Sequence, residues 1–558
     1  MVDNYYIADQ FSLLSKLMDI HAENTFKARS YGAAAFNIEK LPEQLNTIAP
    51  EKLSSLKGIG ESAAKKIIEI LETGKLKVLE EIISKTPPGV IEMLSIKGIG
   101  PKKISTIWKE MEIESIGELL YACNENRLTL FKGFGGKTQQ NVQEAIEFYL
   151  QNQGSFLYAE IAAIFPSVND YLTKSFGAGN VFVTGSYRRQ QLTIDELEFI
   201  VAKPIDIIKK AFQTAYPPEM LDETSASVFY KLKNGLKLRL YSVGSNITEK
   251  LFLSTGTSEF TEAFLKFCPK PDYSGNEETI FVKAGLNFIP PCLRESGDIV
   301  KRAKKAAFAP MIQASDIKGI IHSHSNWSDG SNTVEEMANA CIAKGLEYLV
   351  LSDHSKAAAY ASGLSEEKIK EQHRYIDELN NKLSPFKIFK SIECDILGDG
   401  AMDYSNNVLS TFDLVIASIH SNLKMTEEKA MGRLLRAIEN PYTTILGHPT
   451  GRLLLSRGGY PVNHEKIIEA CVANHVVIEL NAHPRRLDID WRWIQHAIDK
   501  GAMISIDPDA HSLEGFEDCR YGVLAAQKGG LTKDKNLSSF TLKEFEGFLA
   551  KRRKLKKI

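Results

Sequence analysis

The sequence predicts a multidomain protein with a helical N-terminal region, a mixed α/β middle region and a C-terminal barrel of alternating strands and helices. At 558 residues the chain is too long for a single hydrophobic core. A Gly-x-Gly pattern occurs three times before residue 140, and eleven of the twelve histidines lie at or after residue 322. We therefore expect the two ends of the chain to carry different chemistry.

Composition narrows the class of protein. Hydrophobic residues make up 43% and charged residues 25% of the chain, as in folded globular domains. The net charge of −2 means that any surface for nucleic acid is local. Seven scattered cysteines without a Cys-x-x-Cys pair, no basic-apolar leader and no long apolar run predict a cytoplasmic protein that does not use a membrane. The final segment, KRRKLKKI, is expected to be frayed and solvated.

The N-terminal repeat consists of an apolar residue, a lysine and a glycine, then an apolar residue and a second glycine, followed by a helix-like segment. Its three copies begin LKGIG, IKGIG and FKGFG. Glycines permit a tight turn, and the N–H groups of the turn and of the next helix form a cradle for phosphate. The repeats resemble helix-hairpin-helix motifs, which implies DNA binding without base preference; the alternative is a plain helix connection. The residues assigned to DNA are Lys57, Gly58, Gly60, Lys97, Gly98, Gly100, Lys132, Gly133 and Gly135.

Lys66 follows the first hairpin on its predicted second helix. A lysine beside a phosphate site can form a Schiff base with an abasic sugar when its amine is partly deprotonated. Lys66 is therefore a candidate lyase residue. The alternative is a lysine that contacts phosphate or solvent.

The middle region contains the β-rich runs NVFVTGSYRR and LEFIVA. From about residue 5 to 300 the chain resembles the family X DNA polymerases, in which lyase-like, fingers, palm and thumb domains follow one another. Family members read Gly-Ser-x-Arg-Arg, then Asp-x-Asp, with a third Asp on a later strand. Gly185, Ser186 and Arg188 match this pattern, whereas Glu196 and Glu198 take the places of the first two aspartates. Arg239 takes the place of the third.

These departures predict a palm with weak or lost catalysis. Mg²⁺ requires near-ideal octahedral oxygen ligands, and an arginine cannot ligate a metal. We therefore expect neither Mg²⁺ at the palm nor efficient use of deoxynucleotides. Arg239 is expected to pair with Glu196 or Glu198. The alternative is an alignment that has slipped by one residue and an arginine that faces outward.

The C-terminal region alternates strand-like and helical runs, and successive strand-like runs end in histidine, aspartate or glutamate. His322 and His324, spaced by one on a strand, point to the same side. Parallel strands with polar residues at their carboxyl ends are typical of a (β/α) barrel with its active face at that end. We therefore predict a polynuclear metal site. Its nine residues are His322, His324, Asp329, His354, Glu393, His420, His448, Asp509 and His511.

This region resembles the polymerase-and-histidinol-phosphatase (PHP) domains, which form a distorted (β/α)7 barrel holding up to three metals. The resemblance implies three metal positions: His322, His324, Glu393 and Asp509; Glu393, His420 and His448; Asp329, His354 and His511. Mixed imidazole and carboxylate ligands favour Mn²⁺ or Zn²⁺. The implied chemistry is attack of metal-activated water on phosphorus, with Glu393, Asp509 and His420 as catalytic residues. Arg452 is a candidate for substrate phosphate, with a structural salt bridge as the alternative.

The order of the regions resembles that of bacterial family X polymerases whose PHP domain is a 3′–5′ exonuclease. The expected function is DNA repair: 3′–5′ exonuclease hydrolysis of gapped, nicked or 3′-ended DNA, with nucleoid association while on DNA and base excision repair as the expected pathway. Alternatives are a bifunctional gap-filling polymerase and exonuclease, a repair scaffold and a small-molecule phosphatase. The expected domains are lyase-like (1–85), fingers-like (86–150), palm (151–243), thumb (244–300), linker (301–315) and PHP barrel (316–558).

Overall fold

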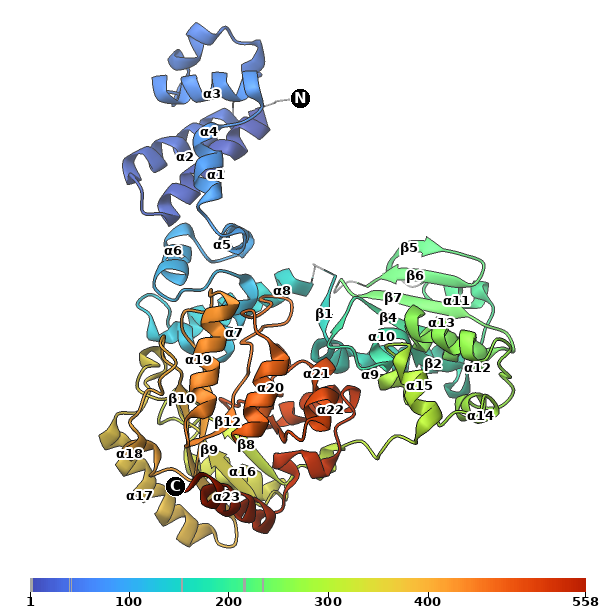
Figure 1. Cartoon of the computed structure of the whole chain (residues 1–558). Helices are drawn as coiled ribbons and strands as arrows, with labels where there is room; N and C mark the ends of the chain where they lie inside the picture. The colour runs from blue at the N-terminus through green and yellow to red at the C-terminus, as the bar shows by residue number, and fades with distance from the viewer. Residues whose placement is uncertain (1–3, 40, 42, 152–153, 214–216, 233–234) are drawn as a thin grey trace. The chain divides into compact units, whose positions relative to one another are not determined.

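The computed structural model describes residues 4–39, 41, 43–151, 154–213, 217–232 and 235–558. The chain divides into two compact units, Met1–Tyr149 and Leu150–Ile558 (Figure 1). Each unit has its own core, so each is described by itself. The finer domain boundaries within the units stay predictions.

The first unit is helical. Its longest early helices, α1 and α2, pack against each other, and a short 3₁₀ turn precedes each of the three Gly-x-Gly repeats. The helices are α1 (Asn4–Ile20), α2 (Thr25–Glu39), α3 (Glu61–Thr73), α4 (Lys77–Ser84), α5 (Pro88–Glu92), α6 (Pro101–Lys109), α7 (Ile116–Asn124) and α8 (Gly136–Gln151). The 3₁₀ turns are η1 (Leu45–Thr47), η2 (Pro50–Ser55), η3 (Met93–Ser95) and η4 (Arg127–Leu130).

The middle of the chain forms a five-stranded mixed sheet in the order β2-β4-β7-β6-β5. Strands β4 and β7 run parallel, and the other neighbouring strands run antiparallel. The strands are β2 (Val181–Thr184), β4 (Glu196–Val201), β5 (Glu219–Glu223), β6 (Ser227–Lys231) and β7 (Lys237–Ser242), with β1 (Phe156–Leu157) and β3 (Thr193–Ile194) as a separate pair. The accompanying helices are α9 (Tyr158–Phe176), α10 (Gly185–Arg188) and α11 (Ile205–Ala211).

Four helices follow the sheet and enclose a core rich in phenylalanine. Phe252, Phe260, Phe264 and Phe281 are fully buried in this core. The helices are α12 (Ile247–Thr255), α13 (Ser258–Phe267), α14 (Glu277–Lys283) and α15 (Asp298–Lys305).

The C-terminal region forms a seven-stranded parallel barrel in the order β14-β13-β12-β11-β10-β9-β8. The barrel is nearly closed, because Ser323 at the end of β8 bridges to Ala510 beyond β14. Most strand residues are buried, as expected for strands covered on both faces. The strands are β8 (Gly319–Ser323), β9 (Tyr348–Leu351), β10 (Lys387–Asp395), β11 (Leu414–Ser418), β12 (Thr443–Leu446), β13 (Val477–Asn481) and β14 (Ile504–Asp507).

Helices cover the outside of the barrel. They are α16 (Val334–Ala343), α17 (Glu366–Leu383), α18 (Asn406–Leu409), α19 (Glu427–Glu439), α20 (His464–Ala473), α21 (Trp491–Asp499), α22 (Cys519–Lys528) and α23 (Leu542–Lys556). The prediction that KRRKLKKI is frayed is wrong, because α23 includes most of it. Arg552 in this segment is buried and donates to the carbonyl oxygens of His475 and Pro441.

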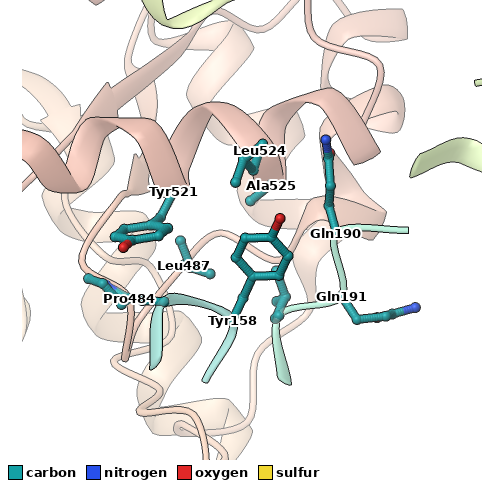
Figure 2. A pocket seen from close by; sticks show the side chains of 10 residues that line it. Tyr158, Gln190, Gln191, Pro484, Leu487, Tyr521, Leu524 and Ala525 are labelled. Carbon is teal, nitrogen blue, oxygen red and sulfur yellow. The ribbon is translucent and has the colours of Figure 1, made fainter. Parts of the chain in front are cut away.

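Within the second unit, the turn after α10 packs against α22. A pocket of about 10 Å³ lies between them, lined by Tyr158, Gln190, Gln191, Tyr521 and neighbouring apolar side chains (Figure 2). This is roughly the space that one water needs, so it is a packing gap rather than a ligand site. Gln190 also donates to the side-chain carbonyl of Gln527 at 3.1 Å.

Lys528, at the end of α22, is buried and makes polar contacts with the middle region of the chain. Its Nζ donates to the carbonyl oxygens of Arg189 and Cys292 at 2.8 and 3.3 Å, and pairs with the Glu295 carboxylate at 2.5 Å. Burial lowers the pKa of Lys528, and the charge of Glu295 opposes that shift. Glu295 also pairs with Arg189 at 3.3 Å.

Replacing Lys528 by methionine is expected to lower the free energy of unfolding of this unit by about 3 kcal/mol. The change leaves Glu295 with one partner fewer in a buried setting, and breaking buried pairs is costly. Urea unfolding followed by tryptophan fluorescence measures the loss, because the Lys528 Nζ lies 4.7 Å from the ring centre of Trp491. Lys500→Met, which removes a surface pair with Glu469, is the control and is expected to change little. Equal losses in both variants would contradict the prediction.

Candidate metal centre and nucleic-acid interface

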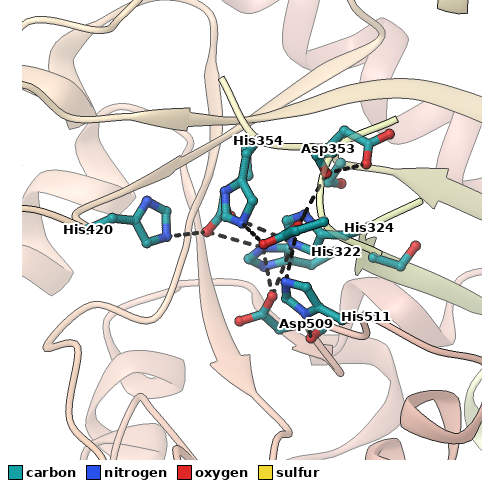
Figure 3. Close-up of polar contacts among 12 residues, drawn as sticks. His322, His324, Asp353, His354, His420, Asp509 and His511 are labelled. Carbon is teal, nitrogen blue, oxygen red and sulfur yellow. Dashed lines mark hydrogen bonds and ion pairs between the residues drawn. The ribbon is translucent and has the colours of Figure 1, made fainter. Parts of the chain in front are cut away.

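The nine predicted metal ligands lie together at the carboxyl ends of the barrel strands. Strand β8 carries His322, and His324 follows it directly; Glu393 lies within β10. The others lie in the segments after β8, β9, β11, β12 and β14: Asp329, His354, His420, His448, Asp509 and His511. Figure 3 shows imidazoles and carboxylates from these separate strands facing one another.

Glu393 is the centre of the cluster. Its carboxylate oxygens lie 2.9 Å from the His448 Nε2 and 3.0 Å from the His354 Nδ1. The Nε2 atoms of His322 and His420 each lie 3.2 Å away. Burial opposes ionisation of Glu393, but the surrounding imidazoles outweigh burial and hold its pKa well below the usual range.

The ligand atoms form three groups, and the atoms within each group lie within 4.8 Å of one another. Their members are His322, His324, Glu393 and Asp509; His354, Glu393 and His420; His324, Asp329, His354 and His511. The first group is the predicted set. The second group has His354 where His448 was predicted, although the His448 Nε2 also lies 2.9 Å from Glu393, and the third group is the predicted set with His324 added. These clusters can hold metal ions.

The donor atoms fit divalent ions. His322 Nε2, Asp329 Oδ2 and Glu393 Oε2 are buried and make no hydrogen bond within the described residues. Burial lowers the pKa of His324 to about 3, whereas carboxylates outweigh burial at His322 and His354 and raise the pKa of both rings. A metal binds the neutral imidazole, so binding would displace protons from His322 and His354. Nitrogen and carboxylate donors together suit Mn²⁺ or Zn²⁺, and which of them binds stays a prediction.

Three of the nine ligand residues have left-handed backbone. The φ angles are +59° at His322, +21° at His448 and +52° at Asp509. His322 lies where the register between β8 and β9 shifts. Residues with side chains rarely adopt these angles, and such strain persists where surrounding contacts hold it, often at functional sites.

Sequence reasoning missed the buried polar residues that support the ligands. Asp395 lies 3.1 Å from the Nδ1 of His420. Asp353 accepts hydrogen bonds from the side chains of Ser325, Ser328 and Gln372, and so orders the loop that carries Asp329. Glu479, Asn481 and Arg486 lie on or just after β13. The apolar run VVIELNA was the available signal, because its two polar residues alternate.

Arg452 lies beside this face of the barrel. Its Nε donates to the Arg486 carbonyl at 2.9 Å, and its terminal nitrogens bond Asp490 and the Leu487 carbonyl. These contacts correspond to the salt-bridge alternative, and a role in phosphate binding stays a prediction. Arg486 lies nearer the ligands, with its Nε 3.6 Å from the Asp509 carboxylate.

In the middle sheet, Arg239 lies between the altered acids. Its Nε and Nη2 bond both carboxylate oxygens of Glu196 at 3.1 to 3.2 Å, and its guanidinium lies 4.1 Å from the ring centre of Phe229. The parallel register pairs Arg239 with Glu198, so the arginine shares the face of both acids. An ion pair therefore occupies this position.

Glu198 and Arg188, two further residues of the polymerase-like site, also bond other side chains of the protein. Glu198 accepts a hydrogen bond from the Tyr241 hydroxyl at 2.8 Å, and burial raises the Glu198 pKa. A side chain on Gly185, whose φ is +65°, would overlap the Glu198 carboxylate, which explains the glycine before Ser186. Arg188 bonds Thr255 at 2.6 Å and pairs with Glu277.

The three hairpins share one construction. The apolar residue between the two glycines is buried, as Ile59, Ile99 and Phe134, and the lysine before them is exposed. Their first glycines, Gly58, Gly98 and Gly133, have φ of +80°, +90° and +93°. Gly60 and Gly100 are the N-cap residues of α3 and α6, and Gly135 immediately precedes α8. Each repeat thus places a lysine at the surface beside the N–H groups of a helix start.

Lys66 projects from α3 beside α2. Its Nζ lies 5.5 Å from the ring centre of Tyr31 and the side chain is half-buried. This position is compatible with both alternatives for Lys66, and the lyase role stays a prediction.

Gly60→Val and Gly100→Val together are expected to weaken DNA binding without loss of folding. Both glycines have ordinary negative φ and open space where a side chain would extend, so the change narrows only the approach of a phosphate. The unmodified protein should also lose affinity on the order of 10³-fold between 50 and 200 mM salt. Fluorescence anisotropy with two unrelated DNA sequences measures both effects. Gly179→Val, at an exposed glycine outside the hairpins, is the matched control; equal affinity of all variants would contradict the interface.

Three family models match the chain. The models are a helix-hairpin-helix domain over residues 2–76, a SAM-like helix-hairpin-helix tandem over 90–147 and a PHP domain over 321–483. They define a DNA-binding helix-hairpin-helix protein that carries a PHP domain. The chain is 31% identical over 560 residues to the DNA polymerase/3′-5′ exonuclease PolX of Bacillus subtilis, over 95% of this chain and 96% of the relative. It belongs to the bacterial PolX family, the family X DNA polymerases with a C-terminal PHP domain.

The C-terminal region is also similar to smaller proteins. One is a probable phosphatase of Thermoanaerobacter sp., 25% identical over 234 residues, which are 40% of this chain and 91% of the relative. Another is a probable phosphatase of Vibrio parahaemolyticus, 27% identical over 253 residues, 43% of this chain and 96% of the relative. Among the described residues, no helix is long and apolar enough to cross a membrane.

Proposed function

We propose that this protein is a cytoplasmic DNA repair enzyme that hydrolyses DNA phosphodiesters from 3′ ends at the PHP metal centre, with a palm that has lost efficient nucleotidyl transfer. The observation that carries the proposal is the convergence of nine ligand-type residues: eight form the three groups, two of which include the buried Glu393, and the ninth, His448, has its Nε2 2.9 Å from Glu393. The name of the Bacillus subtilis relative, which includes a 3′-5′ exonuclease, supports the same activity.

DNA as substrate is supported by the first unit. The hairpins expose lysines and helix-start N–H groups, which contact phosphates and do not distinguish bases. Gapped, nicked or 3′-ended DNA are the proposed forms, because an exonuclease needs an end and repair intermediates supply it.

The chain's own residues prepare the site for hydrolysis. Divalent ions supply activation of water and neutralisation of phosphate charge when they are bound. Glu393 and Asp509 present carboxylate oxygens between imidazoles, so one charged group can serve neighbouring metal positions. His420 is held by Asp395 at the outer side of the cluster, and the Arg486 guanidinium lies near Asp509, where a substrate phosphate would meet it.

Two other functions remain candidates because particular relatives favour them. A bifunctional gap-filling polymerase and exonuclease is favoured by the name of the Bacillus subtilis relative. A small-molecule phosphatase is favoured by the probable phosphatases that match the C-terminal region. The hairpins favour DNA over a small molecule, and the Arg239–Glu196 pair argues against the polymerase.

An assay on 5′-labelled gapped DNA with Mn²⁺, with and without deoxynucleotides, separates these functions. The proposal predicts shortened products under both conditions. Products that lengthen with nucleotides would support the bifunctional polymerase, and unchanged DNA together with hydrolysis of histidinol phosphate would support the phosphatase. Unchanged DNA together with no phosphatase activity would favour the remaining alternative, a DNA-binding repair scaffold without enzymatic activity.

A further inference from the structure

Among the seven barrel strands, β13 is the one that has none of the nine ligand residues either within the strand or in the segment that follows it. It instead places two polar side chains, Glu479 and Asn481, in the interior, and both are fully buried. They are two residues apart and so point to the same side of the strand. A buried carboxylate and amide are costly unless every polar atom finds a partner, which makes their partners informative.

Glu479 contacts two ligand residues. Its Oε1 lies 2.5 Å from the His322 Nδ1, and its Oε2 accepts the backbone N–H of His448 at 2.5 Å. A carboxylate is an acceptor only, so the His322 Nδ1 carries a proton, and the neutral ring, the form that binds a metal, then has its lone pair on Nε2. That Nε2 faces Glu393 at 3.2 Å and Asp509 at 3.4 Å, inside the first metal group.

Asn481 extends the contacts to a third ligand. Its Nδ2 donates to the Asp509 Oδ2 at 3.0 Å, while the Asp509 Oδ1 faces the His324 Nε2 at 3.1 Å. The amide thus turns one carboxylate oxygen of Asp509 toward the metal position.

The residues held in this way are the strained ones. Among the nine ligand residues, all of which the structure describes, positive φ occurs at His322, His448 and Asp509. These are the three ligands that Glu479 and Asn481 bond. Two independent observations, hydrogen bonding and backbone conformation, therefore select the same three residues.

We propose that Glu479 and Asn481 are positioning residues of the metal centre: Glu479 sets the His322 tautomer and links two metal positions, and Asn481 orients Asp509. The inference rests on the proposed metal-dependent function. Glu479 contacts His322, a ligand of the first metal position, and His448, a predicted ligand of the second. Asp395, which contacts His420 alone among the ligands, acts on the second position only.

The test uses the full-length protein, stripped with chelator and titrated with Zn²⁺ by calorimetry, and Co²⁺ absorption as a second readout. In Glu479→Gln the amide N–H₂ meets either the His322 Nδ1 or the His448 N–H. The first arrangement forces the imidazole proton onto the ligating Nε2, and the second leaves two donors facing each other. We expect affinity to fall about 10- to 100-fold at two metal positions, while the position of Asp329, His354 and His511 is unchanged.

Asp395→Asn is the matched control, with the same carboxylate-to-amide change. It is expected to lower the Zn²⁺ affinity of the second metal position only, because Asp395 contacts His420. Asn481→Leu cannot donate a hydrogen bond to Asp509 and is expected to lower the Zn²⁺ affinity of the first metal position alone. Unaltered Zn²⁺ binding in Glu479→Gln, or an equal loss at all three positions with unfolding in all three variants, would overturn the inference. If the unmodified protein binds no Zn²⁺ or Mn²⁺, the proposed function itself fails.

Discussion

Replacing Glu393 by glutamine is expected to abolish DNA hydrolysis while leaving DNA affinity nearly unchanged. Glu393 lies within 3.2 Å of four histidines, and an amide there loses the charge that neighbouring metal positions share. The loss should exceed the roughly 100-fold that follows removal of a residue that only supports a ligand. Affinity should persist because the hairpins belong to the first compact unit.

Single-turnover hydrolysis of 5′-labelled DNA, together with anisotropy at matched salt, measures the two quantities. Glu371→Gln, the same change at an exposed position of α17, is the control and should retain full activity. Hydrolysis that survives in Glu393→Gln would exclude the PHP centre as its source. Loss of both hydrolysis and DNA affinity would place binding and chemistry in the same region.

The unmodified palm is expected to give no templated primer extension, even with Mn²⁺, whose geometry is more forgiving than that of Mg²⁺. Two-metal nucleotidyl transfer requires carboxylates that converge on ions about 4 Å apart. Here Arg239 holds both oxygens of Glu196, and Glu198 is bonded to Tyr241. Arg188 pairs with Glu277, which reduces its availability to a triphosphate.

The combined variant Glu196→Asp, Glu198→Asp and Arg239→Asp is expected to recover some extension, and the single changes none. Each variant is made in the Glu393→Gln protein, so that hydrolysis does not remove the extended product. Gel analysis of a labelled primer on gapped DNA gives the result. Robust extension by the Glu393→Gln parent, lost on further change of Glu196 to alanine, would show that the palm is an active polymerase.

The metal-site and palm predictions differ in how much they depend on tertiary contacts. The ligand set was readable because successive strand-like runs, that of β13 excepted, end in or lead to a histidine or an acid, a pattern that belongs to the local sequence. The arginine at the third acidic position was readable by spacing from the Gly-Ser turn. Its partner was open between Glu196 and Glu198, because both lie on one strand face and the choice depends on side-chain geometry.

The sequence by itself determined the order of the regions, the three hairpins, the barrel class and the nine candidate ligands. These features follow from turn chemistry and from the periods of helix and strand, which act over a few residues. Only the tertiary structure decided that His354 borders two metal groups, that Arg239 bonds Glu196 and that β13 supports the centre. His322 and Glu479 are 157 residues apart and meet only when the barrel closes. Contacts across such distances depend on the packing of the whole barrel, which no local pattern encodes.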